Sequence, residues 1–368
     1  MTSSPKKIAI IHDWLNGMRG GEKVLEVIAD IFPDSDIFTL LLDESKISQK
    51  ILAHKITTSF IQRLPFWRSK YRSYLPLFPR AIEKFDLSEY DLLISISHCV
   101  AKGAIPAKNA THICYCLSPV RYVWQFYEQY FGRNPLKRLF LKPFLNKIRK
   151  WDYESCSRVN HFIAISKTVA ERIKRFYDRE SDVIYPPVNT AYFTPSENSS
   201  REDYFFVVSA LVPYKRIDLA VGAFNKLGLP LRIVGNGPEL NKLRKMASNN
   251  IVFEGWLSDE EVRERYRTCR ALIFPGEEDF GLTPIEANAC GTPVIAYRKG
   301  GVVESIVDGI TGLFFNEQTE DSLIGAIKKF EISKFNTNIC RTQSLKFDTE
   351  VFKKNFTEYI LEKYKENT

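Results

Sequence analysis

The chain has 368 residues, of which 44% are hydrophobic and 26% charged, a composition that is typical of a globular protein and excludes a disordered one. No stretch approaches the roughly 18 consecutive apolar residues that a helix needs to cross a bilayer, so a membrane-spanning protein is not expected. The net charge of +8 indicates attraction to something anionic, such as phosphate, lipid headgroups or nucleic acid.

The first residues do not have the pattern of a targeting signal. Lys6 and Lys7 precede the apolar run Ile8–Ile11, but His12 and Asp13 end that run before it could be the core of a signal peptide. The seven cysteines are an odd number without any C-x-x-C pair, so neither a disulfide framework nor a zinc site is indicated. We therefore expect a cytoplasmic protein with reduced, mostly buried thiols.

Short β-rich runs alternate with helical periodicity in two successive series, which is the pattern of parallel sheets covered by helices on both faces. The runs of the first series are 8–11, 37–42, 92–96, 112–116 and 162–165. Those of the second series are 204–208, 231–234, 251–253, 271–274, 293–296 and 313–315. The sequence predicts an α/β protein with two doubly wound Rossmann-like domains facing across a cleft.

The connection between the domains is predicted at Pro186–Pro187, because paired prolines favour an extended chain and the polar stretch 195–203 follows. The segment Phe347–Tyr364 has apolar residues at helical spacing and should form an amphipathic closing helix. The predicted domains are 1–187, completed by the helix 347–368, and 188–346.

Two stretches of the first half combine basic with aromatic or aliphatic side chains. From Arg133 to Lys150 there are seven basic residues and no acidic one, and a second such stretch runs from Phe60 to Lys84. A solvated basic face is one interpretation. The other is contact with the anionic inner face of a membrane or with a lipid-diphosphate-linked acceptor.

Ligands of doubly wound sheets bind beyond the carboxyl ends of the strands, so the turns from strand to helix are the places to search. The first such turn contains Gly20 and Gly21, which would let a phosphate approach the backbone, although a plain helix-entry turn explains them as well. The turn has neither the G-x-G-x-x-G nor the G-x-x-x-x-G-K-[ST] spacing, so a dinucleotide or P-loop site has no support.

The turn after residues 204–208 places Lys215 and Arg216 at the start of a helix near Ile217. Two cations at a helix start oppose the helix dipole, which costs stability unless an anion binds there. The pattern therefore predicts an anion site, and solvated surface cations are the alternative.

The turn after residues 271–274 carries Glu278 and leads into a helix. Thr283 and Glu286 have the T-x-x-E spacing of a capping box, with Pro284 in the first turn, so the helix is predicted to begin at Thr283. Glu286 could then be only a cap. Glu278 lies in the loop ahead of the cap, where a carboxylate can accept hydrogen bonds from sugar hydroxyls.

Glu278 and Glu286, with seven residues between them, resemble the E-x7-E motif of retaining glycosyltransferase family 4. The resemblance covers nearly the full chain. Further matching segments are Val234–Glu239, Phe253–Ser258, Ile165–Ser166 with Val169–Ala170, Tyr185–Val188 and Gly291–Ala296. The segments Ser97–Gly103 and Ser118–Trp124 are most similar to the bacterial surface-polysaccharide branch of mannosyl- and glucosyltransferases.

The resemblance implies a GT-B fold with an acceptor domain followed by a donor domain. It also implies a retaining, metal-independent hexosyltransferase that uses a UDP-hexose or GDP-hexose, such as UDP-glucose or GDP-mannose. The acceptor would be a glycan or a lipid-linked saccharide in polysaccharide biosynthesis, and no nucleic acid partner is expected.

The resemblance further implies roles for individual residues. The implied catalytic residues are His98, which contacts the sugar, Glu278, which holds its hydroxyls, and Lys215, which neutralises the diphosphate. The implied donor-binding residues are Gly20, Gly21, Arg216, Trp256, Leu257, Phe280, Gly281, Leu282, Thr283 and Glu286, with Glu286 on the ribose and Trp256 and Leu257 at the base. Asp13, Trp14 and Arg121 are placed on the acceptor side.

Two features depart from that pattern. Family members commonly carry an arginine five residues before the lysine, where this chain has Ala210, and Arg216 could supply that charge. Asp34-Ser35-Asp36 looks like a metal-binding D-x-D element, but it lies at the wrong edge of the sheet for a ligand. A nucleotide-sugar epimerase on the same fold and a non-catalytic nucleotide-sugar-binding protein remain the alternatives.

Overall fold

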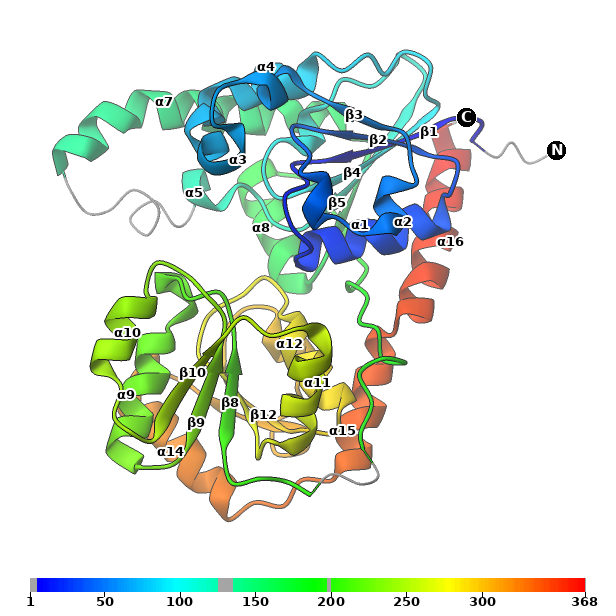
Figure 1. Ribbon diagram of the computed structural model, residues 1–368. Coiled ribbons are helices and arrows are strands. Elements are labelled where there is room, and N and C mark those ends of the chain that lie inside the picture. Colours follow the sequence, from blue (N-terminus) through cyan, green and yellow to red (C-terminus); the bar gives the residue numbers. More distant parts are fainter. Residues whose placement is uncertain (1–4, 125–134, 197–199, 368) are drawn as a thin grey trace. The chain divides into compact units, whose positions relative to one another are not determined.

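The computed structural model describes residues 5–124, 135–196 and 200–367, and the chain forms two compact units (Figure 1). Unit 1 comprises Met1–Pro186 with Phe352–Thr368, and unit 2 comprises Pro187–Val351. Each unit contains one parallel sheet with helices on both of its faces. The predicted α/β class with two Rossmann-like domains is therefore confirmed.

The sheet of unit 1 has the strand order β3-β2-β1-β4-β5-β6-β7. Its strands are β1 Ile8–His12, β2 Asp36–Thr39, β3 Ile56–Thr58, β4 Leu92–Ser97, β5 Thr111–Cys116, β6 His161–Ala164 and β7 Asp182–Val183. The chain runs outward from β1 to β3 on one side and from β4 to β7 on the other. The order thus reverses between β1 and β4, and such a reversal is where doubly wound sheets bind ligands.

Two helical layers cover this sheet. Its helices are α1 Gly20–Ile31, α2 Gln49–Leu52, α3 Trp67–Lys70, α4 Phe78–Glu83, α5 Arg121–Trp124, α7 Pro135–Glu154, α8 Lys167–Tyr177 and α16 Thr349–Asn367. Its 3-10 turns are η1 Glu44–Lys46, η2 Phe60–Arg63, η3 Tyr71–Leu77, η4 Ala101–Gly103 and η5 Ser155–Arg158. On one face Ile11 and Leu93 join the cluster that contains Phe78 of α4. On the other face, Tyr115 of β5 meets Phe356 of α16 with ring centroids 5.8 Å apart.

The sheet of unit 2 has the strand order β10-β9-β8-β11-β12-β13, which reverses between β8 and β11. Its strands are β8 Phe205–Val208, β9 Leu231–Val234, β10 Ile251–Gly255, β11 Leu272–Phe274, β12 Val294–Tyr297 and β13 Gly312–Phe315. Its helices and 3-10 turns are α9 Ile217–Leu227, α10 Leu240–Met246, α11 Asp259–Thr268, α12 Leu282–Ala289, α13 Val302–Ser305, α14 Glu320–Glu331, α15 Thr337–Ser344, η6 Pro213–Lys215 and η7 Leu345–Phe347. Helix α9 packs with α10 and α14, and α12 packs with α11 and α15.

The start of α12 differs from the prediction. The helix begins at Leu282, one residue earlier than predicted, because Gly281 takes the N-cap position with a φ of 90°. No side chain caps this end, so the predicted capping box of Thr283 and Glu286 is wrong. The Glu286 carboxylate instead accepts a hydrogen bond from the Tyr266 hydroxyl at 3.0 Å.

The carboxyl-terminal segment begins as η7 and continues as α16, and the division between the units falls inside α16, after Val351. In unit 1, the side chains of Phe352, Phe356, Ile360 and Tyr364 are buried at four-residue spacing. The predicted amphipathic helix is therefore present, and it extends to Asn367.

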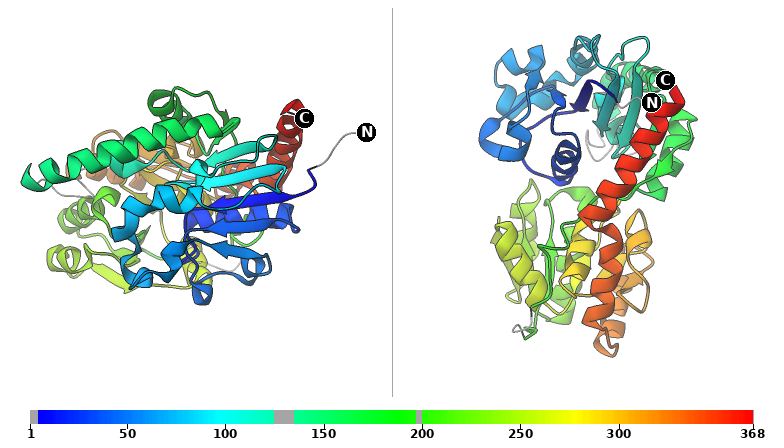
Figure 2. Two further views of the ribbon diagram at one scale, coloured as in Figure 1. Left: turned by 90° about the horizontal axis from the view of Figure 1, so that it is seen from above. Right: turned by 90° about the vertical axis from the view of Figure 1, so that its right-hand side faces the viewer.

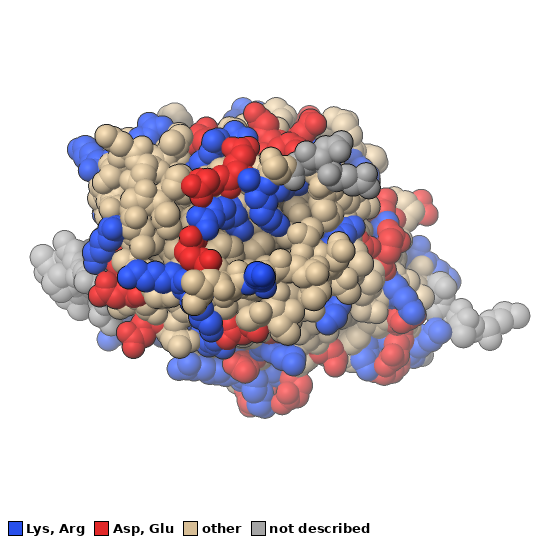
Figure 3. All heavy atoms as spheres, turned by 90° about the horizontal axis from the view of Figure 1, so that it is seen from below, with Lys and Arg blue, Asp and Glu red and all other residues tan. Residues whose placement is uncertain are grey.

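Over the residues described, no helix combines the length and the apolar character needed to cross a membrane. All seven cysteines are buried, and none forms a disulfide. On the face drawn in Figure 3, the side chains of Lys and Arg lie intermingled with those of Asp and Glu, so this face is not where the positive excess gathers.

Candidate functional site

The reversal of strand order in unit 2 brings two of the predicted ionic residues together. Lys215 ends η6, which follows β8, and Glu278 lies in the turn after β11. Lys215 Nζ and Glu278 Oε1 form an ion pair whose side chains are only 15% and 21% exposed. This pair therefore stands at the place where a doubly wound sheet offers backbone amides and helix ends to a ligand.

Arg216 forms the entry to α9 in an uncommon conformation. Its φ of 53° and ψ of 40° are left-handed, and no side chain caps the helix. The guanidinium is held by two neighbours, with Nε 3.2 Å from Asp218 Oδ1 and Nη1 3.4 Å from Gln318 Oε1. A non-glycine residue in this region costs on the order of 1–3 kcal/mol, and such strain is often found where a ligand binds.

The loop that carries Glu278 makes close backbone contacts at Gly276, Gly300 and Gly301. A Cβ on Gly276 would lie 2.9 Å from Lys215 Cα, and a Cβ on Gly301 would lie 2.3 Å from the Asp279 carbonyl oxygen. Gly301 N–H also donates to the Glu278 carbonyl at 2.9 Å. The Gly300–Gly301 pair was not identified from the sequence, although a glycine pair just after a predicted strand is a detectable signal.

The residues that follow Glu278 form the start of α12. Phe280 is buried and meets the Phe347 ring at 5.6 Å, whereas Leu282 and Thr283 are half-buried in the first turn. Gly281 joins loop and helix, as described above. The predicted donor-binding residues 280–283 therefore share one helix N-terminus, where backbone N–H groups lack intrahelical partners.

Glu286 lies one turn further along α12 and is 9% exposed. Its partner Tyr266 is fully buried, and burial followed by the charge of Glu286 raises the pKa of that hydroxyl well above its ordinary value. Tyr266 thus stays a hydrogen-bond donor at any physiological pH. It was not identified from the sequence, because nothing in the pattern of α11 indicates which residue it faces.

The remaining predicted residues of unit 2 also lie at carboxyl ends of strands. Trp256 directly follows β10 and is 75% exposed, and Leu257 beside it is half-buried. Ala210 follows β8 and is exposed. A Cβ on Gly235, after β9, would lie 1.8 Å from the Ser209 carbonyl oxygen, so the turns after β8 and β9 touch through their backbones.

Unit 1 has an acid and a base at its own reversal, between β1 and β4. Asp13 follows β1, is fully buried, and accepts the backbone N–H groups of residues 98–101 at 2.6–2.9 Å. His98 Nδ1 lies 3.0 Å from Asp13 Oδ2. Burial alone would raise the pKa of Asp13, but the charge of His98 and these hydrogen bonds lower it to about 2.

His98 is the partly exposed member of this pair, with a third of its side chain accessible. Its ring meets the Trp14 ring edge-on at 4.5 Å. Burial would lower the pKa of His98, but the charge of Asp13 and the hydrogen bond to it raise the pKa above the ordinary 6.5. Glu22 acts in the same direction and Arg121 in the opposite one, so both lie near the imidazole.

The predicted glycines stand at the start of α1. A Cβ on Gly21 would lie 2.9 Å from Leu117 Cδ1 and 3.6 Å from His12 Cε1, so the helix end packs closely on its neighbours. Glu22 is 3% exposed and accepts the Arg19 N–H at 3.1 Å, and burial raises the pKa of its carboxyl. Glu22 is thus a further acidic group near His98 that the sequence analysis did not single out.

The three residues predicted on the acceptor side differ in how exposed they are. Asp13 is enclosed by its five donors and has no accessible surface, so the predicted contact between this carboxylate and an acceptor does not fit its position. Trp14 is 9% exposed and packs on Tyr71 and Phe78. Arg121 begins α5 and is partly exposed.

Asp34 and Asp36 lie at the amino end of β2, whereas Asp13 and His98 follow the carboxyl ends of β1 and β4. Asp36 begins β2 and is bound by the Tyr90 hydroxyl, and Lys55 Nζ is 4.0 Å away. Asp34 is exposed. Within the part of the chain that the structure describes, there is no cluster of three or more His, Cys, Asp or Glu residues that could hold a metal ion.

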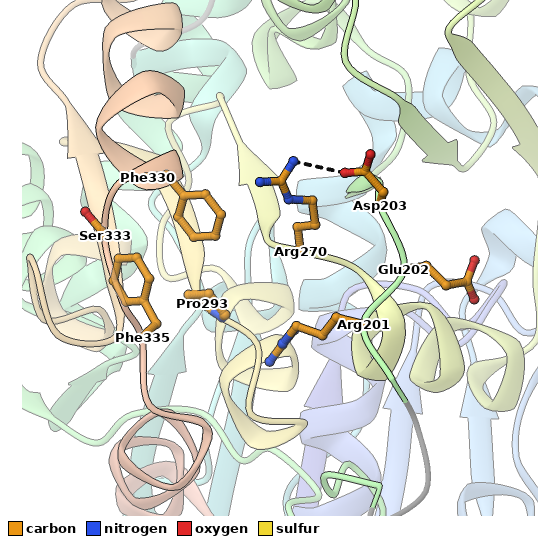
Figure 4. A pocket seen from close by; sticks show the side chains of 8 residues that line it. All are labelled: Arg201, Glu202, Asp203, Arg270, Pro293, Phe330, Ser333 and Phe335. Atoms are coloured by element: carbon orange, nitrogen blue, oxygen red, sulfur yellow. Dashed lines mark hydrogen bonds and ion pairs between the residues drawn. The ribbon is translucent and has the colours of Figure 1, made fainter.

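A hollow of about 340 Å³ lies at the amino ends of the strands of unit 2 (Figure 4). The Lys215–Glu278 pair lies at the carboxyl ends of these strands. Two arginines line the hollow, and both are already bound. Arg270 pairs with Asp203 at 3.0 Å, and Arg201 donates to the carbonyls of Cys269 and Gly291. These guanidinium groups hold the edge of the sheet together and leave little for a ligand.

Two family models match the chain in succession, "Glycosyltransferase Family 4" over residues 36–192 and "Glycosyl transferases group 1" over residues 189–343. An uncharacterized glycosyltransferase of Methanocaldococcus jannaschii is 29% identical over 166 residues, which are 44% of this chain and 46% of the relative. The O-antigen chain mannosyltransferase RfbU of Salmonella typhimurium is 28% identical over 265 residues, which are 66% of this chain and 68% of the relative.

Solved structures show the same architecture. The crystal structure of HepE from Anabaena in complex with UDP-glucose superposes with a TM-score of 0.69 at 16% identity, covering 96% of this chain and 98% of HepE. At this identity the likeness concerns the fold. The curated matches span less than half of the M. jannaschii relative and about two thirds of RfbU.

Proposed function

Because this chain belongs to glycosyltransferase family 4 and has its GT-B fold, we propose that it is a retaining, metal-independent hexosyltransferase. It moves a hexose from a nucleotide-diphosphate sugar, UDP-glucose or GDP-mannose, to a glycan or lipid-linked saccharide in polysaccharide biosynthesis. In this proposal unit 2 binds the donor and unit 1 binds the acceptor.

The observation that carries the proposal is the Lys215–Glu278 ion pair at the strand reversal of unit 2. Breaking a bond between sugar and diphosphate builds negative charge on the leaving nucleotide, and preorganised cations stabilise that charge. Lys215 supplies such a cation, and Glu278 an acceptor for sugar hydroxyls. The ion pair keeps both side chains in place until the donor binds. Lys215 then binds the diphosphate, and Glu278 binds the sugar.

The other residues of unit 2 complete this donor site. Arg216 adds a second cation at the start of α9. It takes over the charge of the arginine that family members commonly carry at the position of Ala210. The amides at the start of α12, from Phe280 to Thr283 and including Gly281 and Leu282, bind the sugar. Glu286, oriented by Tyr266, binds the ribose, and the exposed Trp256 with Leu257 meets the base.

Unit 1 supplies His98 for the sugar and the start of α1, with Gly20 and Gly21, for the diphosphate. The raised pKa of His98 favours its protonated form, which can donate a hydrogen bond to a sugar hydroxyl. The acceptor is then bound near Trp14 and Arg121. We assign no nucleophile, because retention through attack on the same face needs none.

The names of the relatives support a hexose donor without choosing one. RfbU is named a mannosyltransferase, and HepE was crystallised with UDP-glucose. A thermal-shift screen of UDP, GDP, UDP-glucose and GDP-mannose selects the base, since at equal concentration the ligand that binds the native state most tightly raises the melting temperature most.

The decisive variant is Glu278→Gln, with Glu277→Gln as its matched control. Glu277 is the neighbouring carboxylate and pairs with Lys299 at 3.2 Å. We expect E278Q to lower kcat by about 10²-fold, the usual loss when a preorganised polar group is removed, and E277Q to stay near wild type. Full activity of E278Q would refute the assigned site, and conversion of the donor sugar without any acceptor would identify an epimerase.

The same assay tests the chemistry of transfer. Activity that persists in EDTA supports metal independence, and the anomeric configuration of the product, read by NMR, distinguishes retention from inversion. A metal requirement or an inverted product would remove that part of the proposal.

Contact with the inner face of an anionic membrane is part of the proposal and has its own support. Helix α7 runs outward from unit 1 (Figure 2), and its Lys142, Lys147 and Lys150 are exposed. In the second stretch, Phe66 is 70% exposed beside Lys70. Arg133, the first residue of the α7 stretch, lies outside the described residues.

Vesicle binding tests this contact. Anionic vesicles should retain the protein at low salt and release it as salt rises, whereas neutral vesicles should not bind it. Equal binding to both would remove the membrane from the proposal.

A further inference from the structure

His98 begins a segment, residues 98–103, that buried carboxylates hold at both ends. At its start, Asp13 binds four successive backbone N–H groups. At its end, Lys102 is 1% exposed and its Nζ lies 2.9 Å from Asp152 Oδ1 near the end of α7 and 2.7 Å from Ser155 Oγ at the start of η5. Lysine is almost never fully buried unless it is paired, so Asp152 determines where this end of the segment lies.

Asp152 binds two further elements of unit 1. Its Oδ2 accepts the indole N–H of Trp124 at 2.7 Å and the hydroxyl of Tyr177 at 2.9 Å. Trp124 ends α5, the four-residue helix that begins with Arg121, and Tyr177 ends α8. One fully buried carboxylate therefore joins the His98 segment, α5 and α8 to the end of α7.

The segment has no room to shift toward α7. A Cβ on Gly103 would lie 2.4 Å from the ring of Trp151, the residue before Asp152. That indole is fixed in turn, because its N–H donates to Glu83 at 2.7 Å. The ion pair and the glycine contact thus set both the direction and the distance between residues 98–103 and α7.

We propose that Asp152 is a positioning residue that sets where His98 and Arg121 stand, through its ion pair with Lys102 and its hydrogen bond from Trp124. This inference rests on the proposed function of those two site residues. Asp152 has no accessible surface, so it acts on substrate only through them. Stability alone does not account for the pair, since apolar residues of similar volume often replace a buried ion pair at no cost.

The test variant is Lys102→Met with Asp152→Asn. It removes one cation and one anion, so the net charge is unchanged and neither charge is left unpaired. We expect the His98 imidazole to titrate at a lower pH than in wild type, because the loosened segment weakens its contact with Asp13. We also expect kcat for the release of nucleoside diphosphate from UDP-glucose or GDP-mannose to fall by about 10- to 10²-fold. The KM for the donor should stay unchanged.

Two single variants accompany it. Y177F removes one donor from Asp152 and should shift both readouts in the same direction by a smaller amount. Y90F removes a comparable hydroxyl from Asp36, at the far end of the sheet, and should shift neither. If K102M/D152N does not fold, Y177F against Y90F decides by the same two readouts.

If K102M/D152N and Y177F both kept the wild-type titration of His98 and the wild-type kcat, the inference would be overturned. The NMR readout, with resonances assigned through H98Q, needs no turnover. A shifted titration in a protein that transfers no sugar would therefore support the positioning role of Asp152 and defeat the proposed function.

Discussion

Asp13 and His98 share a contact whose contribution to stability depends on pH. The folded pKa of Asp13 is depressed to about 2, so its contribution is present above the ordinary 3.8 and is lost as pH falls toward 2. The folded pKa of His98 is raised, so its contribution is complete below 6.5 and is lost as pH rises through the folded value. The contact therefore contributes most to stability between about pH 4 and pH 6.5.

We expect Asp13→Asn to lower the free energy of unfolding by about 2 kcal/mol within that window, because the fold lowers the pKa of Asp13 from 3.8 to about 2. Urea unfolding of wild type and variant across pH 2–9 measures the difference. It should shrink on both sides of the window, and a difference that does not change with pH would contradict this account of the contact.

Tyr266 offers a second prediction at the scale of single residues. Tyr266→Phe removes the hydroxyl that holds Glu286, while the ring and its contact with Phe206 at 5.6 Å remain. Affinity for the nucleotide selected by the thermal-shift screen should fall about fivefold, on the order of 1 kcal/mol for one hydrogen bond. Y90F serves again as the control. If Y266F and wild type bound the nucleotide equally well, Tyr266 would have no role in donor binding.

The sequence allows the location of residues in the turns after strands to be predicted, but it does not reveal residues whose position depends on contacts across the fold. Lys215 and Glu278 could be predicted because each stands in a turn at a carboxyl end of a strand, where the topology fixes the location. Glu22, Tyr266 and Asp152 lie within helices, and no spacing shows that their side chains reach a partner in a distant element. The burial of Asp13 was missed for the same reason.

At the scale of elements, the loop from Gly276 to Gly281 depends on small residues around it. Gly301 has an ordinary φ of −67°, so only space decides what fits there. An added Cβ would meet backbone atoms, the Asp279 oxygen at 2.3 Å and Phe280 Cα at 2.4 Å, which cannot rotate away as a side chain would. The loop that carries Glu278 must then move.

Gly301→Ala should therefore lower stability by about 1–3 kcal/mol, the usual cost of overpacking, and weaken nucleotide binding. Gly325→Ala is the matched control, since Gly325 lies inside α14 with nothing within 4 Å of an added Cβ. That change should raise stability by up to about 1 kcal/mol through helix propensity. Thermal unfolding with and without nucleotide measures both, and unaltered binding by G301A would show that the loop tolerates displacement.

Apolar runs made most strands predictable, whereas very short strands and a helix that starts at a glycine were not predicted correctly. Every strand named from the sequence is present, although β2 ends at Thr39 and not at residue 42 as predicted. Val- and Ile-rich runs next to turns leave little choice of structure. β3 has three half-buried residues and β7 has two residues, too few to show a pattern. The start of α12 was misplaced because the T-x-x-E spacing outweighed Gly281, whose left-handed φ only the structure reveals.

At the scale of the whole molecule, unit 1 is built from two distant parts of the sequence. Its sheet is made by residues before Pro186, but Tyr115 of β5 is covered by Phe352 and Phe356 of α16, with ring centroids 5.8 Å away in each case. Unit 2 lies between these parts in the chain. The core of unit 1 is therefore complete only when the last residues have been added.

This order predicts which unit a core substitution affects. Phe356→Ala should cost about 3–5 kcal/mol, as expected for a fully buried phenylalanine, and the loss should appear in residues 1–186 although position 356 is far away in sequence. Phe224→Ala, at an equally buried site in α9, should destabilise residues 187–351 instead. Hydrogen exchange followed by mass spectrometry resolves the two cases, because amides exchange faster in the unit whose opening has become less costly. If F356A and F224A accelerated exchange in the same peptides, the chain would unfold as one cooperative body and the assignment of Phe356 to a separately unfolding unit 1 would be wrong.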